Sequence, residues 1–342
     1  MRVLWLSPWL RPLSRVHVEA LRARGAQALL VTSDRHPESG PRREYELLLE
    51  PRPKSPGTWP AFARTLRAAR AFRPDVVVVE LVWDPRWLAF AALAPVVHLI
   101  HDDRPHDATE ERPGWQRRLF ERWSRQAARL VVFSDHVRDS MAAVTGRPLT
   151  VVPLTSDLAD RDAPAPVPAG QRHDMVLVGR LGPYKNLPVV LSAWQRHVSG
   201  PGWRGDRLVL YGDGAAPGPL PDQVRWDRRP FSYHEAVPAI AAAKASIVHY
   251  RRASQSGVQV LSMQLGVTPI VSPEGALPQF QPPDEKPVGV EDVGGLAAAF
   301  DALADPGTAA ARGAVAARHY QQHYAARHAA ERLIAVFAEV AG

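Results

Sequence analysis

Two cations that could bind a diphosphate flank a turn at the start of the second half of the chain. Arg180 follows an apolar run that ends at Gly179, and Lys185 precedes a helical pattern that begins near residue 186. A helix start carries partial positive charge, so the helix and the two side chains together would favour a phosphate ligand. The simplest alternative is a surface turn with solvated cations. Only four of the 42 basic residues are lysines, which favours the binding interpretation.

A second candidate anion site is the Ser-Gln-Ser-Gly turn at residues 254–257. It lies between an apolar run that ends at Tyr250 and a helical pattern that begins near Val258. Backbone N–H groups at this helix start would bind an anion, and Gly257 would let a phosphate approach them closely. Ser256 could both cap the helix and hydrogen-bond the ligand, and an ordinary serine N-cap is the alternative.

Histidines and carboxylates gather after the apolar run at residues 96–100. His101 and Asp102 come first, and the next such residues are Asp103, His106 and Asp107. Asp102 could orient the imidazole of His101 or act on a hydroxyl group. Together with His98 the cluster could instead hold a divalent ion. We rank this below a substrate contact, because His98 lies inside an apolar strand.

Short apolar runs alternate with helical patterns along the chain, which predicts parallel sheets with crossover helices. The runs lack polar alternation, as is typical of strands that are covered on both faces. The strand-like runs are residues 3–6, 28–32, 76–79, 96–100, 130–133, 150–152, 175–178, 208–211, 224–226, 246–250 and 268–271. The helical stretches are residues 15–24, 59–72, 115–128, 135–145, 187–197, 233–243, 258–265 and 308–340, the last with a break near 323.

The chain is predicted to form two α/β domains. Residues 158–173 carry Pro-Ala repeats and charges without an apolar period, so we interpret them as a hinge linker. The domains are then residues 1–157 and 174–342, each doubly wound and Rossmann-like, facing each other across a cleft. The terminal helix could pack back on the first domain. Open sheets of this kind bind ligands beyond the carboxyl ends of their strands.

Three of these segments resemble the large retaining GT-B glycosyltransferase family, the "group 1" enzymes. Residues 179–186 match its G-R-L-x-x-x-K-N segment, and residues 101–106 match the H-D-x-x-P-H loop of a sub-branch that also carries the Q-S-G-V turn of residues 255–258. The resemblance implies a donor domain that binds a nucleotide sugar, an acceptor domain, and no need for a metal ion. It also implies that His101 contacts the donor sugar or the acceptor. The predicted donor-binding residues are Gly179, Arg180, Lys185, Ser254, Gln255, Ser256, Gly257 and Val258.

The chain also departs from this family. The two positions of its Glu-x7-Glu motif fall on Ser254 and Ser262, which leaves the donor and the retaining or inverting outcome open. The loop after the first strand lacks the Gly-Gly pair of many relatives and contains Trp9, Arg11 and Arg15, which suggests a different acceptor. Two weaker matches are the G-x-G turn of residues 212–214 and the loop that borders the nucleobase, with candidates Arg229 and Phe231.

The composition narrows the class of protein. The absence of cysteine excludes disulfides, a cysteine nucleophile and thiolate metal sites. A net charge of +7 favours anionic partners, but no nucleic-acid motif accompanies it. No apolar run reaches the roughly 18 residues of a membrane span, so we expect a cytoplasmic, bacterial protein. The arginine-rich stretch 115–128 could touch an anionic membrane at its inner face, although a core-facing crossover helix is the favoured interpretation.

The resulting prediction is a glycosyltransferase without metal or cofactor. A sugar would move from a nucleotide-diphosphate sugar to a hydroxyl of a glycan, a lipid-linked sugar or a small molecule. An epimerase or hydrolase of the same fold is an alternative, in which His101 and Asp102 supply acid–base groups. A non-catalytic nucleotide-sugar-binding protein is another, motivated by the missing glutamates. The sequence does not specify the base, the sugar, the acceptor or the oligomeric state.

Overall fold

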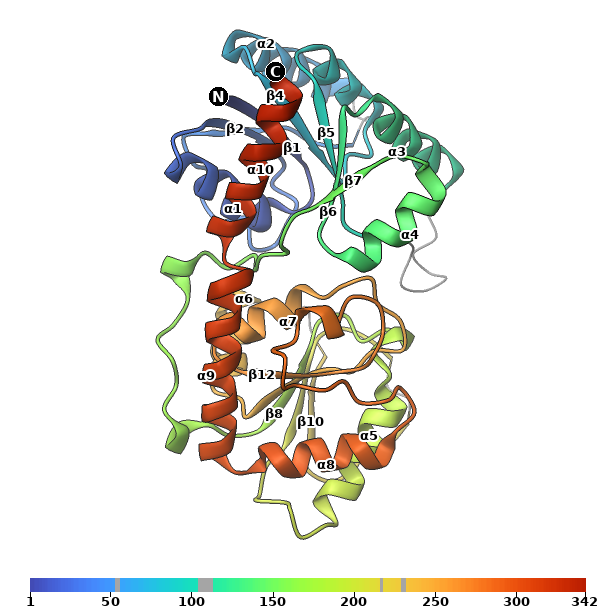
Figure 1. Ribbon diagram of the computed structural model, residues 1–342, viewed down its shortest axis with the longest axis vertical. Coiled ribbons are helices and arrows are strands. Elements are labelled where there is room, and N and C mark those ends of the chain that lie inside the picture. Colours follow the sequence, from blue (N-terminus) through green and yellow to red (C-terminus); the bar gives the residue numbers. More distant parts are fainter. Residues whose placement is uncertain (53–55, 104–112, 216–217, 229–231) are drawn as a thin grey trace. The chain divides into compact units, whose positions relative to one another are not determined.

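The computed structural model describes residues 1–52, 56–103, 113–215, 218–228 and 232–342 of the chain (Figure 1). The described residues divide into two compact units. The first contains residues 1–158 and 325–342, and the second contains residues 159–324. The segment that the composition marks as a linker therefore belongs to the second unit from residue 159 on.

The first unit is built around a seven-stranded parallel sheet with the order β3-β2-β1-β4-β5-β6-β7. Its strands are β1 (Arg2–Ser7), β2 (Gln27–Thr32), β3 (Glu46–Leu48), β4 (Val76–Glu80), β5 (Val96–Ile100), β6 (Arg129–Val132) and β7 (Leu149–Val151). Its α-helices are α1 (Arg11–Ala23), α2 (Trp59–Phe72), α3 (Gly114–Gln126), α4 (Asp135–Thr145) and α10 (Ala326–Ala341). The strand order reverses between β1 and β4, which pair with Leu4 opposite Val77.

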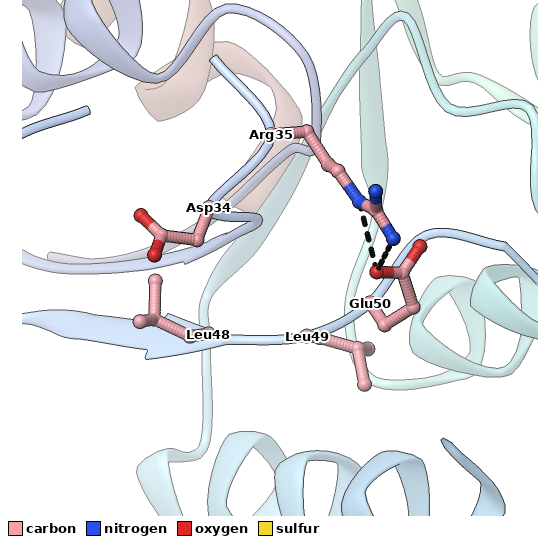
Figure 2. A pocket seen from close by; sticks show the side chains of 5 residues that line it. All are labelled: Asp34, Arg35, Leu48, Leu49 and Glu50. Carbon is pink, nitrogen blue, oxygen red and sulfur yellow. Dashed lines mark hydrogen bonds and ion pairs between the residues drawn. The ribbon is translucent and has the colours of Figure 1, made fainter. Parts of the chain in front are cut away.

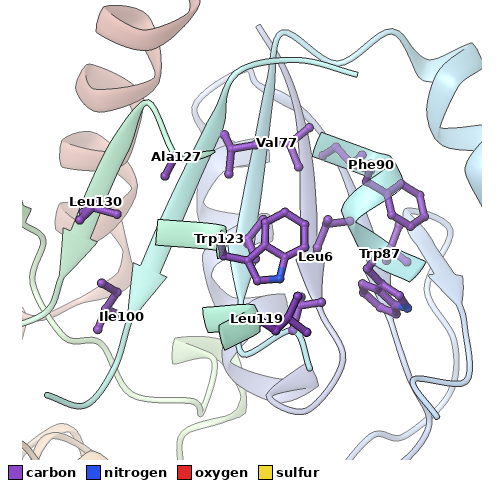
Figure 3. Packing of buried hydrophobic residues seen from close by; sticks show 14 of the residues in the cluster. Leu6, Val77, Trp87, Phe90, Ile100, Leu119, Trp123, Ala127 and Leu130 are labelled. Carbon is purple, nitrogen blue, oxygen red and sulfur yellow. The ribbon is translucent and has the colours of Figure 1, made fainter. Parts of the chain in front are cut away.

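The apolar strands of this sheet are buried because helices cover them. All five residues of β4, four valines and Glu80, are buried. Figure 3 shows one side of the core, where Trp87 and Trp123 pack with Leu6 and Val77. The last helix, α10, packs along α1 and buries Leu333 and Phe337 (Figure 1). Residues 325–342 therefore complete the first unit.

Helix α3 uses its apolar stripe for the core. Leu119 and Trp123 are buried, whereas Trp115 at the start of the helix is exposed. The arginines of α3 lie on the exposed side of the helix. A core-facing crossover helix, which the sequence favoured, therefore explains why Leu119 and Trp123 are buried. Among the described residues, none of the helices combines the length and the hydropathy that a bilayer crossing requires.

The second unit is built around a five-stranded parallel sheet with the order β10-β9-β8-β11-β12. Its strands are β8 (Met175–Val178), β9 (Leu208–Tyr211), β10 (Val224–Asp227), β11 (Ala245–Val248) and β12 (Thr268–Val271). Its α-helices are α5 (Leu187–Val198), α6 (Tyr233–Ala241), α7 (Gly257–Gln264), α8 (Val293–Ala304) and α9 (Pro306–His323). The core contains Trp194 and Phe300, whose rings meet edge to face.

Strand order in the second sheet decides where its loops meet. The chain proceeds from β8 outward to β10, then returns to the other side of β8 with β11, so β8 and β11 are neighbours. Ligands of doubly wound sheets bind at the carboxyl ends of the strands where the order reverses. The loops after β8 and β11 contain the two candidate anion sites, and the fold brings these loops to that point.

Candidate functional site

Lys185 is a buried cation at the reversal point of the second sheet. Its side chain donates hydrogen bonds to the carbonyl of Val178 at 3.0 Å and to the phenol oxygen of Tyr250 at 2.5 Å. The ammonium nitrogen also lies 4.1 Å from the centre of the Tyr250 ring. Lys185 is only 4 % exposed, because the residues after β8 and β11 close around it. The loop after β8 thus points its lysine toward the loop after β11.

The partners of Lys185 are all neutral. Among the described residues no carboxylate forms an ion pair with it. Burial lowers the pKa of Lys185 to about 8, and the neighbouring Arg180 also lowers it. A buried ammonium group without a counter-ion is unfavourable, and an anion beside it would restore the charged form.

Glycines let the loops after β8 and β9 lie against each other. The residue Gly179 has φ +107°, and a Cβ there would lie 3.3 Å from the Lys185 nitrogen. A Cβ on Gly212 would lie 2.1 Å from the carbonyl oxygen of Gly179, and one on Gly214 would lie 2.5 Å from that of Leu181. The G-x-G turn of residues 212–214 is therefore explained by close backbone packing.

The start of α7 presents backbone N–H groups to open space. Ser256 occupies the N-cap position, but its side chain makes no capping bond and instead lies 3.4 Å from the phenol oxygen of Tyr250. Within the described residues, the N–H groups of Gly257 and Val258 have no acceptor. Nothing lies within 4 Å of a Cβ built on Gly257. The ordinary serine cap is thus not the role of Ser256, and the amides can receive a ligand.

Three other polar residues of this turn and helix are Ser254, Gln255 and Ser262. Ser254 is buried, and its carbonyl accepts a hydrogen bond from the N–H of Ala276. The side-chain oxygen of Gln255 is buried and has no partner among the described residues. Ser262 is buried and donates to the carbonyl of Val258 inside α7. Of the two serines at the family's glutamate positions, Ser262 thus uses its hydroxyl for the backbone of its own helix.

Two side chains that sequence reasoning missed fix the loop geometry. Asn186 has φ +54°, a left-handed conformation that asparagine tolerates, and α5 begins directly after it. Its amide nitrogen donates to the carbonyl of Val290 and contacts Nδ1 of His249, whose Nε2 lies 3.0 Å from the carbonyl of Gly289. Asparagine in the K-N pair was the available signal for this backbone position. The sequence contained no signal for the role of Tyr250, because an aromatic residue near the end of a strand is common.

The candidate histidine of the first unit is held by a carboxylate far away in the sequence. Nε2 of His101 lies 2.7 Å from Oε1 of Glu80, at the end of β4. Both side chains lie at the carboxyl ends of neighbouring strands, because β4 pairs with β5. We expected Asp102 either to orient this imidazole or to act on a hydroxyl group. The carboxylate that the structure places at Nε2 of the ring is that of Glu80.

His98, the first ligand of the alternative metal site, contacts other side chains inside the first unit. Nδ1 of His98 lies 3.2 Å from the hydroxyl of Ser124, and its ring packs against Phe120 inside the unit. Among the described residues no group of three or more His, Asp or Glu side chains could hold an ion. His106 and Asp107 lie outside the described residues, as do the nucleobase candidates Arg229 and Phe231.

The arginines after β1 belong to the interior. Arg11 is fully buried and pairs with Glu46 at 2.7 Å, and Arg15 pairs with the same carboxylate at 2.6 Å. Burial by itself would raise the pKa of Glu46, but hydrogen bonds from both arginines lower it to about 2. These side chains tie α1 to β3. Their presence is therefore not evidence for an altered acceptor.

A pocket of about 360 Å³ lies beyond the carboxyl ends of β2 and β3. Asp34, Arg35, Leu48, Leu49 and Glu50 line it (Figure 2). Arg35 and Glu50 form an ion pair at its rim, and Asp34 pairs with the buried Arg11 at 2.6 Å. Carboxylates beside exposed leucine can bind a polyhydroxyl compound.

Comparison with known proteins supports the fold. Residues 16–160 match the model of Glycosyltransferase Family 4. Sucrose-phosphate synthase from Thermosynechococcus elongatus matches 99 % of both chains with a TM-score of 0.72 and 16 % identity. HepE from Anabaena, solved in complex with UDP-glucose, covers 99 % of this chain and 100 % of its own, with a TM-score of 0.67 and 13 % identity. No curated protein matches the sequence.

A third solved structure comes from a different enzyme class. A putative UDP-N-acetylglucosamine 2-epimerase from Listeria monocytogenes covers 98 % of this chain and 95 % of its own, with a TM-score of 0.61 and 14 % identity. Together with the two parallel sheets and their flanking helices, these matches confirm the predicted GT-B fold.

Proposed function

We propose that this protein is a glycosyltransferase that moves a sugar from a nucleotide-diphosphate sugar to an acceptor hydroxyl. The observation that carries the proposal is the buried, carboxylate-free Lys185 beside the open amides of α7, at the point where the strand order of a GT-B sheet reverses. The match of residues 16–160 to Glycosyltransferase Family 4 supports the same class. The product would be a glycan, a glycolipid or a decorated small molecule.

The second unit would hold the diphosphate. Lys185 and Arg180 would contact its oxygens, and the N–H groups of Gly257 and Val258 would bind it from the helix start. Ser256 would hydrogen-bond the ligand, since its hydroxyl does not cap α7. These donors offset the negative charge that develops on the departing diphosphate. The proposed reaction therefore requires neither a metal ion nor a cofactor.

The first unit would hold the acceptor, with His101 touching the acceptor or the transferred sugar. The resemblance to retaining enzymes predicts an unchanged anomeric configuration, whereas Ser254 and Ser262 replace both family glutamates. Anomeric proton couplings of the first product, measured by NMR, decide between the two outcomes. The pocket lined by Asp34 and Leu48 is a second place where an acceptor hydroxyl compound would fit.

Donor binding gives the first test. Calorimetric titration with UDP, GDP, ADP and dTDP should detect one nucleotide that binds, and the corresponding nucleotide sugars should then be screened for transfer. UDP is the first choice, because HepE was solved with UDP-glucose and with UDP. Thermal shift supplies an independent signal, since a ligand that binds only the folded state raises its apparent stability. Absence of binding by all four nucleotides and their sugars would contradict the proposal.

An epimerase or hydrolase is the second candidate. The Listeria epimerase neighbour and the acid–base character of the His101–Glu80 pair favour it over other classes. Incubating the donor without any acceptor separates the two functions. A transferase leaves nearly all the donor intact, whereas an epimerase accumulates an isomeric nucleotide sugar and a hydrolase releases free sugar.

We also propose a cytoplasmic protein that touches an anionic membrane through α3. Arg117, Arg118, Arg122 and Arg125 are exposed on this helix, and Trp115 is 49 % exposed at its start. Arginines attract anionic headgroups, and tryptophan favours the interface. Sedimentation with vesicles that contain anionic lipid should exceed that with neutral vesicles and should fall in high salt. Equal sedimentation with both would exclude the contact.

A further inference from the structure

A buried carboxylate lies where the strand order of the first sheet reverses. Glu80 ends β4, and the strand on its other side is β1, which contributes Trp5. His101 follows β5, and Ser14 lies on α1. Four elements thus converge on one carboxyl group at the edge where a doubly wound sheet places its ligand. The glycosyltransferase assignment does not by itself explain this cluster.

Glu80 is completely buried and is ionised. Burial by itself would raise the pKa of Glu80, but its hydrogen bonds, first of all that with His101, lower it to about 2. The other oxygen, Oε2, accepts a hydrogen bond from the indole N–H of Trp5 at 3.1 Å. The Ser14 hydroxyl lies 2.9 Å from the same oxygen. A carboxylate with three polar neighbours keeps its charge and its orientation.

An ionised carboxylate only accepts hydrogen bonds, so the proton of neutral His101 must be on Nε2. The lone pair of the ring is then on Nδ1. Among the described residues Nδ1 has no hydrogen-bond partner, and the His101 side chain remains 10 % exposed while that of Glu80 is fully covered. The Nε2 edge of the ring thus faces Glu80, and Nδ1 is the ring nitrogen that remains for a ligand.

We propose that Glu80 is a positioning residue that makes Nδ1 of His101 the base for the acceptor hydroxyl. This inference rests on the glycosyltransferase function. The acceptor oxygen forms its bond to the anomeric carbon, and its proton moves to Nδ1. The bond from the anomeric carbon to the diphosphate breaks, and its electron pair leaves with the diphosphate. The Glu80 carboxylate stabilises the imidazolium cation, which afterwards loses its proton to water.

The remaining charged and titratable neighbours do not supply this stabilisation. His17 on α1 is buried between the rings of Trp5 and Phe133, and burial lowers its pKa to about 4, so it is neutral at physiological pH. Asp103 accepts a hydrogen bond from Ser140 and lies 4.0 Å from His136 on α4. The charge that acts on the imidazole is that of Glu80.

The variant Glu80→Gln tests the role of the charge. The amide can donate its N–H to Nε2, which would favour the wrong tautomer with the proton on Nδ1. Turnover should fall about 100- to 1,000-fold, as is typical when a general base is lost. The KM for the nucleotide sugar should change less than twofold, because the donor binds to the other unit.

Ser124→Ala is the matched control. It removes a buried hydroxyl from another histidine of the same sheet, His98, but keeps Glu80 and its bond to His101. Its turnover should coincide with that of the wild type. A Glu80→Gln protein that loses stability but keeps the wild-type turnover would show that Glu80 is only structural.

A measurement on the unaltered protein covers the case in which Glu80→Gln fails to fold. Nitrogen-15 NMR of the histidine rings distinguishes the two neutral tautomers at pH 8. The inference requires His101 with its proton on Nε2, and a ring with its proton on Nδ1 would overturn it. Because this readout does not need activity, failure of the inference is distinguishable from failure of the glycosyltransferase assignment, which would show as absent donor binding.

Discussion

The substitution Gly257→Ala should stabilise the protein and still weaken its binding of the donor. Gly257 is the first residue of α7, its φ lies in the ordinary range, and no atom lies within 4 Å of a Cβ built there. The folded chain can therefore accept the methyl group. Alanine loses less backbone entropy than glycine on folding, so the free energy of unfolding should rise by roughly 0.4–1 kcal/mol.

The same methyl group would occupy the place of the ligand. The Cα–Cβ bonds of a helix tilt toward its N-terminus, so the new carbon points at the anion that we propose for the α7 amides. Losing one charge-assisted hydrogen bond costs about 1.5–3 kcal/mol, which corresponds to a roughly 10- to 100-fold rise in Kd. Calorimetric titration with UDP, or with whichever nucleotide binds, measures this Kd, and chemical denaturation without ligand measures the stability.

Gly170→Ala supplies the comparison. Gly170 is exposed in the same unit, has an ordinary φ, and likewise has nothing within 4 Å of a built Cβ. It should gain similar stability and leave the Kd unchanged. If Gly257→Ala binds the nucleotide as tightly as Gly170→Ala does, no phosphate lies against the start of α7, and the proposed site is wrong.

Four further changes test the site. Lys185→Ala should weaken nucleotide binding tenfold or more by calorimetry, because a charge-assisted contact is lost, and an unchanged Kd would remove Lys185 from the site. Burial lowers the pKa of Lys185 to about 8, so nucleotide affinity should fall as the pH rises above 8, and Lys185→Ala should not show this trend. The free energy of unfolding should change in the opposite direction. In the unfolded chain Lys185 titrates near 10.5, so between pH 8 and 10.5 the unfolded state binds more protons than the folded state. The contribution of Lys185 to the free energy of unfolding therefore increases as the pH rises through this window. Tyr250→Phe removes an acceptor from the Lys185 ammonium group and should raise the Kd about tenfold, whereas a Kd equal to that of the wild type would make Tyr250 a packing residue. EDTA should leave transfer intact, and activity that is lost and then restored by one divalent ion would revive a metal site around His101.

Local patterns were sufficient to predict most of the strands, although β3 was missed. The anion site remains a prediction. Buried parallel strands read as continuous apolar runs, and Lys185 stands out because lysine is rare in this chain. Gly257 also stands out, because glycine loses more backbone entropy on folding than other residues do. Close approach of a ligand to the start of the helix would explain why glycine is found there. The GT-B fold could be predicted because the pattern of each short segment indicates its own secondary structure. Contacts between distant segments were not needed for this prediction.

Distant pairs could not be predicted, because sequence spacing does not determine which side chains meet. Glu80 reads as the polar end of a valine strand, and its bond to His101 depends on the pairing of β4 with β5. Asp102 is the nearer carboxylate in sequence, whereas Nε2 of His101 lies on Glu80, 21 residues away. The buried partner of Arg11 and Arg15 could not be predicted for the same reason, since Glu46 lies more than 30 residues away from either.

The return of α10 to the first unit has a consequence for synthesis on the ribosome. The Leu333 and Phe337 side chains that seal α1 are translated only after all of residues 159–324. At about 5–20 residues per second, these 166 residues take on the order of ten to thirty seconds. During this interval the nascent first unit exposes an apolar seam, while the second unit has its whole sequence available. The half that begins first is therefore completed last.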